Sequence, residues 1–126
     1  MVNRRQEISL MKTLIIVPCY NEAARLETSA FVDFIRTRED IGFLFVNDGS
    51  ADDTRKMLDA MAARSDRISV LHLEQNQGKA AAVRYGFLKG FQSNALFIGY
   101  LDADLAAPLS SIPELIAVLD DPQKDI

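Results

Sequence analysis

Four short apolar runs alternate along the chain with segments in which apolar residues recur at helical spacing. The runs are TLIIVP (13–18), FLFVND (43–48), ISVLHL (68–73) and ALFIGYL (95–101). Each has the length of a strand, and the first is continuous and β-branched, which is typical of a strand buried on both faces of a sheet. We therefore predict four strands, of which the first lies in the interior of the sheet.

Helical patterns follow each of these runs. Apolar residues recur at helical spacing over 26–35, 57–62 and 112–119, and GKAAAVRYGFLKGF (78–91) reads as a helix whose alanines allow close packing. Ser50 with Asp53, and Ser111 with Glu114, have the spacing of a capping box. We therefore expect the second helix to begin at Ser50 and the fourth at Ser111.

Alternating strands and helices predict an α/β fold, with three α/β/α layers around a mostly parallel sheet. We expect one domain over residues 13–126, preceded by an N-terminal extension over 1–12. The final DDPQKDI (120–126) reads as a turn followed by the first residues of another strand. The domain is therefore expected to be truncated at its C-terminal end, and its open sheet edge offers a surface for a homodimer.

Composition narrows the class of protein. The net charge is −4 and no basic cluster is present, so we expect no nucleic-acid partner. A single cysteine excludes an internal disulfide and fits a reducing compartment, which favours the cytoplasm. The glycine fingerprints G-x-G-x-x-G and G-x-x-x-x-G-K-[ST] are both missing, which argues against a dinucleotide dehydrogenase and a P-loop kinase.

Polar side chains follow every predicted strand, at the edge of a parallel sheet where ligands bind. Asp102 and Asp104 follow the fourth strand, and residues i and i+2 of an extended segment face the same way. Two carboxylates so close repel unless a cation lies between them, and Mg²⁺ or Mn²⁺ with water and substrate phosphates would serve. The alternative is that both acids cap a loop and face water.

The other strand ends leave similar alternatives open. Asp48 either forms a simple turn or accepts hydrogen bonds from a ligand base. Lys79 follows Gly78 at a helix N-terminus, where it either meets an anion or stays solvated. Tyr20 could stack on a base and Glu22 could favour the start of the first helix through its charge. Cys19 and His72 are interpreted as structural.

In the order in which they occur, four motifs resemble the family 2 glycosyltransferases, which are inverting enzymes of the GT-A fold. The motifs are IIVPCYNEAARL (15–26), FVNDGSADDT (45–54), NQGKAAAVRYGF (76–87) and YLDADLAAP (100–108). Within that family the set looks most like the polyprenyl-phosphate (dolichyl-phosphate) hexose synthases, of which this chain would be the N-terminal, nucleotide-binding half.

The resemblance implies a metal-dependent transfer of a hexose from UDP- or GDP-hexose to an acceptor, with a polyprenyl phosphate as the expected acceptor. Pro18, Tyr20 and Glu22 would line the nucleotide pocket, and Asp48 would bind the base. Lys79 would lie beside the diphosphate. Asp102 and Asp104 would be the catalytic and metal-binding pair, with Asp102 also beside the ribose or sugar.

The sequence departs from the family pattern in two respects. Mannosyl-phosphate synthases of this group often have DADLQHP, but this chain has Ala106 at the glutamine position and looks nearer to the glucosyl-type relatives. The family fold also continues beyond the length of this chain. A non-catalytic donor-binding or interaction domain is therefore the alternative function, and the full enzyme would lie at the inner membrane face. A nucleotidyltransferase is a weaker third option, because PCYNE lacks the glycine-rich loop usual there.

Overall fold

The computed structural model describes residues 11–119, and in that range the helices and strands follow the predicted order. The turn and strand expected within 120–126 lie outside the described residues, as does most of the N-terminal extension. The strands are β1 (Thr13–Cys19), β2 (Ile41–Asp48), β3 (Ile68–Leu73) and β4 (Phe97–Tyr100). The helices are α2 (Thr28–Thr37), α3 (Thr54–Ala62), α4 (Lys79–Gly90) and α5 (Ser111–Leu119).

The four strands form one sheet in the order β3-β2-β1-β4, and all three pairings are parallel. The two central strands are the most apolar, and every residue of β2 is buried. A parallel sheet needs cover on both faces, which explains why β1 and β2 read as continuous apolar runs. The predicted α/β class with a mostly parallel sheet is confirmed.

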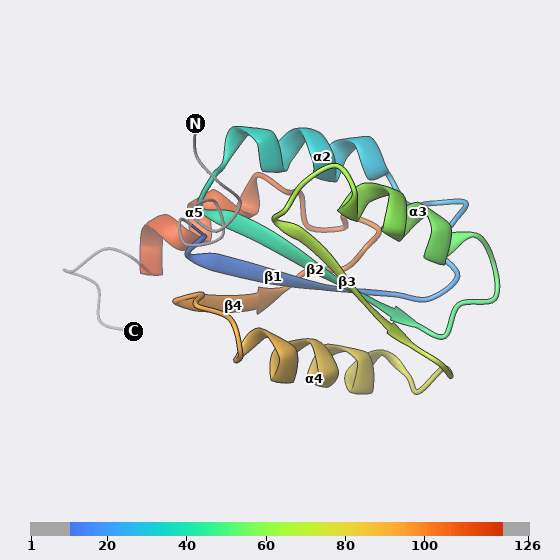
Figure 1. The fold of residues 1–126 in the computed structure, drawn as a ribbon. Coiled ribbons are helices and arrows are strands. Elements are labelled where there is room, and N and C mark those ends of the chain that lie inside the picture. Colours follow the sequence, from blue (N-terminus) through green and yellow to red (C-terminus); the bar gives the residue numbers. More distant parts are fainter. Residues whose placement is uncertain (1–10, 120–126) are drawn as a thin grey trace.

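Helices cover both faces of the sheet, with α2 and α3 on one side and α4 on the other (Figure 1). Phe43 and Phe45 point from β2 toward α2, where the ring of Phe31 meets both of them edge-on, with centroids 5.3 and 5.1 Å away. Such edge-to-face pairs add about 1 kcal/mol each to the gain from burial. Leu44 and Val46 belong to the second cluster, under α4.

Gly86 brings α4 close to the sheet. A Cβ added at this position would lie 2.3 Å from Cγ2 of Ile16 and 3.1 Å from Cγ2 of Val46. The missing side chain therefore lets the helix backbone rest on the two central strands, and this seats the N-terminus of α4 beside their carboxyl ends.

One of the two predicted helix starts is wrong. Helix α3 begins at Thr54 rather than Ser50, and Asp53 at its N-cap makes no side-chain capping bond. Ser50 instead accepts a hydrogen bond from the backbone N–H of Asn21, at 3.0 Å. Helix α5 begins at Ser111, as predicted, and the Ser111 hydroxyl donates to the carbonyl of Pro108.

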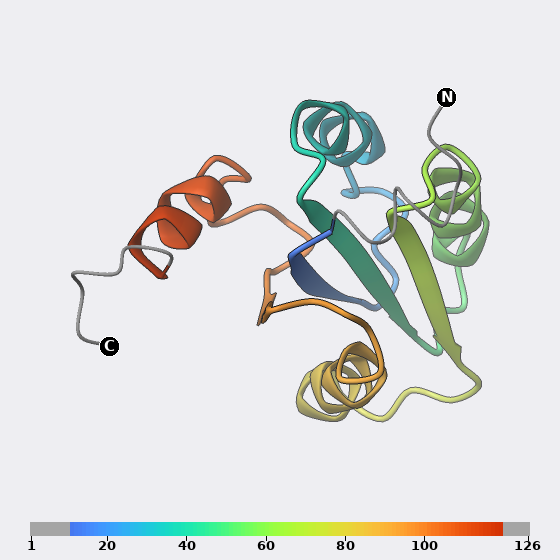
Figure 2. The ribbon, with the colours of Figure 1, turned by 60° about the vertical axis from the view of Figure 1, so that its left-hand side comes forward.

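The edge strand β4 leads through a turn to α5, which lies apart from the other helices in Figure 2. Helix α5 reaches the core through Ile112, with the partly buried Ile116 beside it. Within residues 11–119, none of the helices has both the length and the apolar character needed to cross a membrane.

Candidate nucleotide-sugar site

A polar cavity of about 490 Å³ lies at the carboxyl ends of β1, β2 and β4 and beside the N-terminus of α4. Its lining consists of Pro18, Cys19, Tyr20, Glu22, Asp48, Asn76, Gly78, Lys79, Ala82, Asp102, Ala103 and Asp104. Parallel strands all end at the same edge of a sheet, so segments far apart in sequence meet here.

Every site residue predicted from the sequence lines this one cavity, including both carboxylates after β4. The geometry therefore brings the predicted set together, whereas the role assigned to each residue stays a prediction. Asn76 was missed. It lies in the connection from β3 to α4 and is the first residue of the motif NQGKAAAVRYGF (76–87), which is the signal that could have found it.

Asp48 is nearly fully buried, with 3% of its surface exposed. Its Oδ1 accepts the backbone N–H of Gln77 at 2.8 Å. Its Oδ2 accepts the backbone N–H of Gly78 at 2.9 Å and the side-chain amide of Asn76 at 3.0 Å. A carboxylate offers about four lone-pair positions, so these three donors leave about one for a ligand. Asp48 thus anchors the loop before α4, and it can still accept one hydrogen bond from a base.

Lys79 and Asp102 form an ion pair across the cavity, although both side chains are about half exposed. The ammonium also lies 5.8 Å from the ring centroid of Tyr100. The carboxylate of Asp102 raises the pKa of Lys79, so the lysine is charged at neutral pH. Lys79 and Asp102 neutralise each other in this arrangement, so an anionic phosphate at Lys79 or a cation at Asp102 would have to displace the ion pair.

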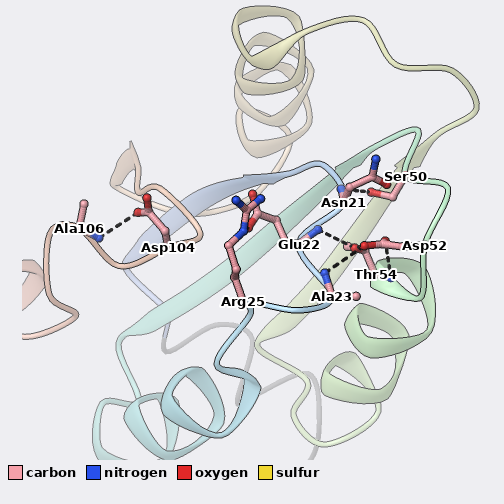
Figure 3. Close-up of polar contacts among 9 residues, drawn as sticks. All are labelled: Asn21, Glu22, Ala23, Arg25, Ser50, Asp52, Thr54, Asp104 and Ala106. Carbon is pink, nitrogen blue, oxygen red and sulfur yellow. Dashed lines mark hydrogen bonds and ion pairs between the residues drawn. The ribbon is translucent and has the colours of Figure 1, made fainter.

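Asp104 caps the turn that follows β4. Its Oδ1 accepts the backbone N–H of Ala106 at 2.9 Å (Figure 3), while Leu105 adopts a left-handed φ of +58°. Asp104 is exposed and also lines the cavity. Capping and ligand binding, which the sequence left as alternatives, are therefore compatible at this residue.

Two carboxylates on one cavity wall suit a hard divalent cation as donors. Among the described residues, 11–119, no group of three or more His, Cys, Asp or Glu side chains gathers into a metal-binding cluster. Asp102 and Asp104 alone would hold such an ion, and water and substrate phosphates would supply its other ligands, as is usual for Mg²⁺. The residues present therefore fit a metal shared with a diphosphate.

The loop after β1 forms one wall of the cavity and carries Tyr20 and Glu22. The side chain of Glu22 is 18% exposed and pairs with Arg25 at 3.2 Å. Burial, with help from the carboxylate of Glu22, raises the pKa of the Cys19 thiol to about 12. Cys19 is therefore a neutral, apolar part of the wall at physiological pH, as the sequence predicts.

His72 lies outside this cavity. Its Nδ1 is 3.0 Å from the side-chain amide of Asn47, and its Nε2 is 2.8 Å from the Asp59 carboxylate. An amide N–H can only donate, so Nδ1 accepts and Nε2 carries the proton that is donated to Asp59. His72 joins the end of β2 to α3, which agrees with its structural interpretation.

A cavity at the carboxyl edge of an open parallel sheet is where α/β proteins, nucleotide-binding ones among them, hold their ligands. Comparison with known protein families identifies the family within this class. The chain belongs to glycosyl transferase family 2, whose family model matches residues 14–126.

Curated relatives agree with this family. The chain is 34% identical over 105 residues to a putative glycosyltransferase, CsbB, of Bacillus subtilis, covering 81% of this chain and 31% of the relative. It is 35% identical over 112 residues to a dolichyl-phosphate β-glucosyltransferase of Trichomonas vaginalis, covering 82% and 32%. An undecaprenyl-phosphate 4-deoxy-4-formamido-L-arabinose transferase of Yersinia enterocolitica is 34% identical over 119 residues, covering 89% and 35%. The chain thus spans about a third of the length of these relatives.

Solved structures show the same fold. A mannosyltransferase of Pyrobaculum calidifontis, solved with GDP-mannose and Mn²⁺, aligns with a TM-score of 0.67 and 23% identity, covering 88% of this chain and 33% of that one. A glucosyl-3-phosphoglycerate synthase of Mycobacterium tuberculosis, solved with Mn²⁺ and UDP, aligns with a TM-score of 0.64 and 20% identity, covering 94% and 44%. The predicted GT-A fold is therefore confirmed.

Proposed function

We propose that this chain is the donor-binding half of a metal-dependent glycosyltransferase that transfers a hexose from UDP- or GDP-hexose to a polyprenyl phosphate. The observation on which the proposal rests is the single cavity in which Pro18, Tyr20, Glu22, Asp48, Lys79, Asp102 and Asp104 meet. Family membership supports the reaction class, and the names of two relatives support the acceptor.

In this proposal the base lies against Tyr20, where an exposed aromatic ring can stack, and takes the remaining acceptor position on Asp48. The diphosphate lies at the N-terminus of α4, where Gly78 permits close approach and Lys79 supplies positive charge. Lys79 must then shift from Asp102 toward the phosphates, which frees a carboxylate oxygen for the metal.

Asp102 and Asp104 would hold the divalent ion, which when bound offsets the charge that develops on the leaving nucleoside diphosphate. In the transfer, an oxygen of the acceptor phosphate forms the new bond to the anomeric carbon. The bond from that carbon to the donor diphosphate breaks, and its electron pair leaves with the nucleoside diphosphate. A phosphate acceptor is already anionic near neutral pH, so the described residues need not provide a strong general base.

This acceptor class also supports a location. A nucleotide-sugar donor and a single free cysteine favour the cytoplasm, and a polyprenyl phosphate favours the inner face of the membrane. The location is part of the same proposal and fails with it if the acceptor proves to be water-soluble.

The proposal is tested by calorimetric titration of the chain with UDP-glucose and GDP-mannose, with and without Mn²⁺. We expect binding of one of them that is strengthened by Mn²⁺. Asp104→Asn keeps an oxygen that can accept from Ala106 but loses the charge, so it should lose the Mn²⁺-dependent part. The matched control Asp33→Asn removes an exposed charge on α2 and should bind as the parent does.

Two results would contradict the proposal. One is a folded parent chain that binds neither nucleotide sugar. The other is Asp104→Asn with the full Mn²⁺ effect, which would remove the metal assignment. Binding without transfer by the full-length protein to a polyprenyl phosphate would instead support the alternative of a non-catalytic donor-binding domain.

A further inference from the structure

Three successive backbone N–H groups in the loop after β1 donate to three side chains, two in the connection between β2 and α3 and one at the first residue of α3. Asn21 N–H donates to Ser50 Oγ at 3.0 Å, and Glu22 N–H donates to Thr54 Oγ1 at 2.9 Å. Ala23 N–H donates to Asp52 Oδ2 at 3.2 Å. Figure 3 shows the three contacts side by side. We call Ser50, Asp52 and Thr54 the loop clamp.

The clamp is reciprocal and internally braced. The Asn21 side chain accepts the backbone N–H of Ala51 at 2.8 Å, so the two loops exchange hydrogen bonds in both directions. The Asp52 carboxylate also accepts the backbone N–H of Thr54 at 2.9 Å and the hydroxyl of the same residue. Thr54 is fully buried, so water cannot reach its hydrogen-bond partners and take over the role of its hydroxyl unless the structure opens.

The loop that the clamp holds has no helix or strand of its own between residues 20 and 27. Asn21 has a left-handed φ of +49°, a conformation that asparagine adopts more readily than most residues with a side chain. Backbone N–H groups of Arg25 and Leu26 donate to the carbonyl of Glu22 within the segment, and Leu26 is buried in the core. The side-chain partners of the clamp add the hydrogen bonds that tie the backbone of residues 21–23 to the neighbouring loop. The first residues of the segment include Tyr20 and Glu22, which line the cavity.

We propose that Thr54 and Asp52 are positioning residues for donor binding: neither lines the cavity, but together they orient the backbone that presents Tyr20 and Glu22 to the nucleotide. This inference rests on the proposed function. It goes further by assigning a role in donor affinity to two residues that lie outside the cavity.

Substitutions at Thr54 separate the hydroxyl from the shape of the side chain. Thr54→Val keeps the volume and loses the acceptor, whereas Thr54→Ser keeps the acceptor and loses a methyl group. Losing one such bond should raise the dissociation constant of the nucleotide sugar by about fivefold in Thr54→Val. Thr54→Ser should stay within about twofold of the parent, and a purely structural role of the side chain would not produce this rescue.

A second, matched pair of substitutions can be made at the exposed residues Asp52 and Asp53. Asp52→Ala removes the acceptor for Ala23 and should also weaken binding by about fivefold. Asp53→Ala removes a neighbouring carboxylate whose ion-pair partner is Lys56, at 3.9 Å, and should bind as the parent does. This pair decides the question if Thr54→Val does not fold.

The experiment titrates UDP-glucose and GDP-mannose with Mn²⁺ into the 126-residue chain and its variants, each checked for folding by urea denaturation. Amide hydrogen exchange at residues 21–23 is measured in parallel and should accelerate in Asp52→Ala. Parent-like affinity in both Thr54→Val and Asp52→Ala, with both folded, overturns the inference and leaves the proposed function standing. A parent that binds neither nucleotide sugar refutes the proposed function instead, and unchanged exchange in Asp52→Ala then overturns the clamp as well.

Discussion

Replacing Asp48 by asparagine should cost much of the stability of the fold, because this buried carboxylate is the anchor of the loop before α4. The side chain accepts from Gln77, Gly78 and Asn76 at 2.8, 2.9 and 3.0 Å. An amide has one oxygen, so whichever way it turns, its NH₂ group faces at least one of these N–H donors.

The size of the effect follows from these contacts. A hydrogen bond to a charged group contributes about 2 kcal/mol and a neutral one about 1 kcal/mol. In the cheaper orientation Asp48→Asn loses the bond to Gln77 and weakens the other two, so we expect a loss of about 4 kcal/mol. A domain of this size has about 5–15 kcal/mol of stability in total, so the midpoint of unfolding should fall markedly.

Urea denaturation followed by circular dichroism measures this difference, with Asp53→Asn as the control. Asp53 is exposed and makes no side-chain capping bond, so its substitution should change the free energy of unfolding by no more than about 0.5 kcal/mol. If Asp48→Asn is as stable as that control, the carboxylate does not anchor the loop and the reasoning on its bonds is wrong.

Three further predictions concern other parts of the fold. Gly86→Ala should destabilise the chain by about 2 kcal/mol in urea denaturation, because its Cβ would meet Ile16 at 2.3 Å; an unchanged midpoint would mean that α4 is seated differently. Arg67→Met should cost about 2 kcal/mol in the same assay, since the guanidinium donates to the carbonyls of residues 35, 38 and 41 at 2.9, 2.7 and 2.8 Å; a loss below about 0.5 kcal/mol would contradict this. The hydrogen bond from Arg38 lowers the pKa of Asp40 in the folded state. The contribution of this carboxylate to the free energy of unfolding is therefore present above about pH 4 and is lost as the pH falls through the folded-state pKa. The stability gap between the parent and Asp40→Asn should therefore close below about pH 4, and a gap that persists at the lowest pH would refute this assignment.

The strands of the sheet interior were predictable because burial on both faces removes polar residues from the pattern. β1 and β2 begin and end within two residues of the predicted ranges, 13–18 and 43–48. The edge strand β4 is shorter than its apolar run, since only Phe97–Tyr100 pairs with β1. The length of a strand depends on its neighbour, which a local pattern does not contain.

The candidate site was predictable in its location but not in its contacts. Strand ends of a parallel sheet must meet, so the positions of Asp48, Lys79 and Asp102 along the chain were enough to bring them together. Their partners could not be inferred. Ser50 was assigned to a helix cap from its local spacing, whereas its hydroxyl accepts a bond from a residue 29 positions away. Side chains that join loops across such separations follow no short-range rule.

The burial of Cys19 makes the only thiol of the chain an intrinsic chemical reporter. A thiol reacts with maleimides and disulfides through its thiolate, and with a pKa of about 12 that form is scarce in the folded protein. Labelling at pH 8 therefore requires an excursion that frees the end of β1. The labelling rate of Cys19, measured with and without nucleotide sugar, therefore reports how often the structure opens locally at the end of β1. This measurement needs no added label or introduced residue.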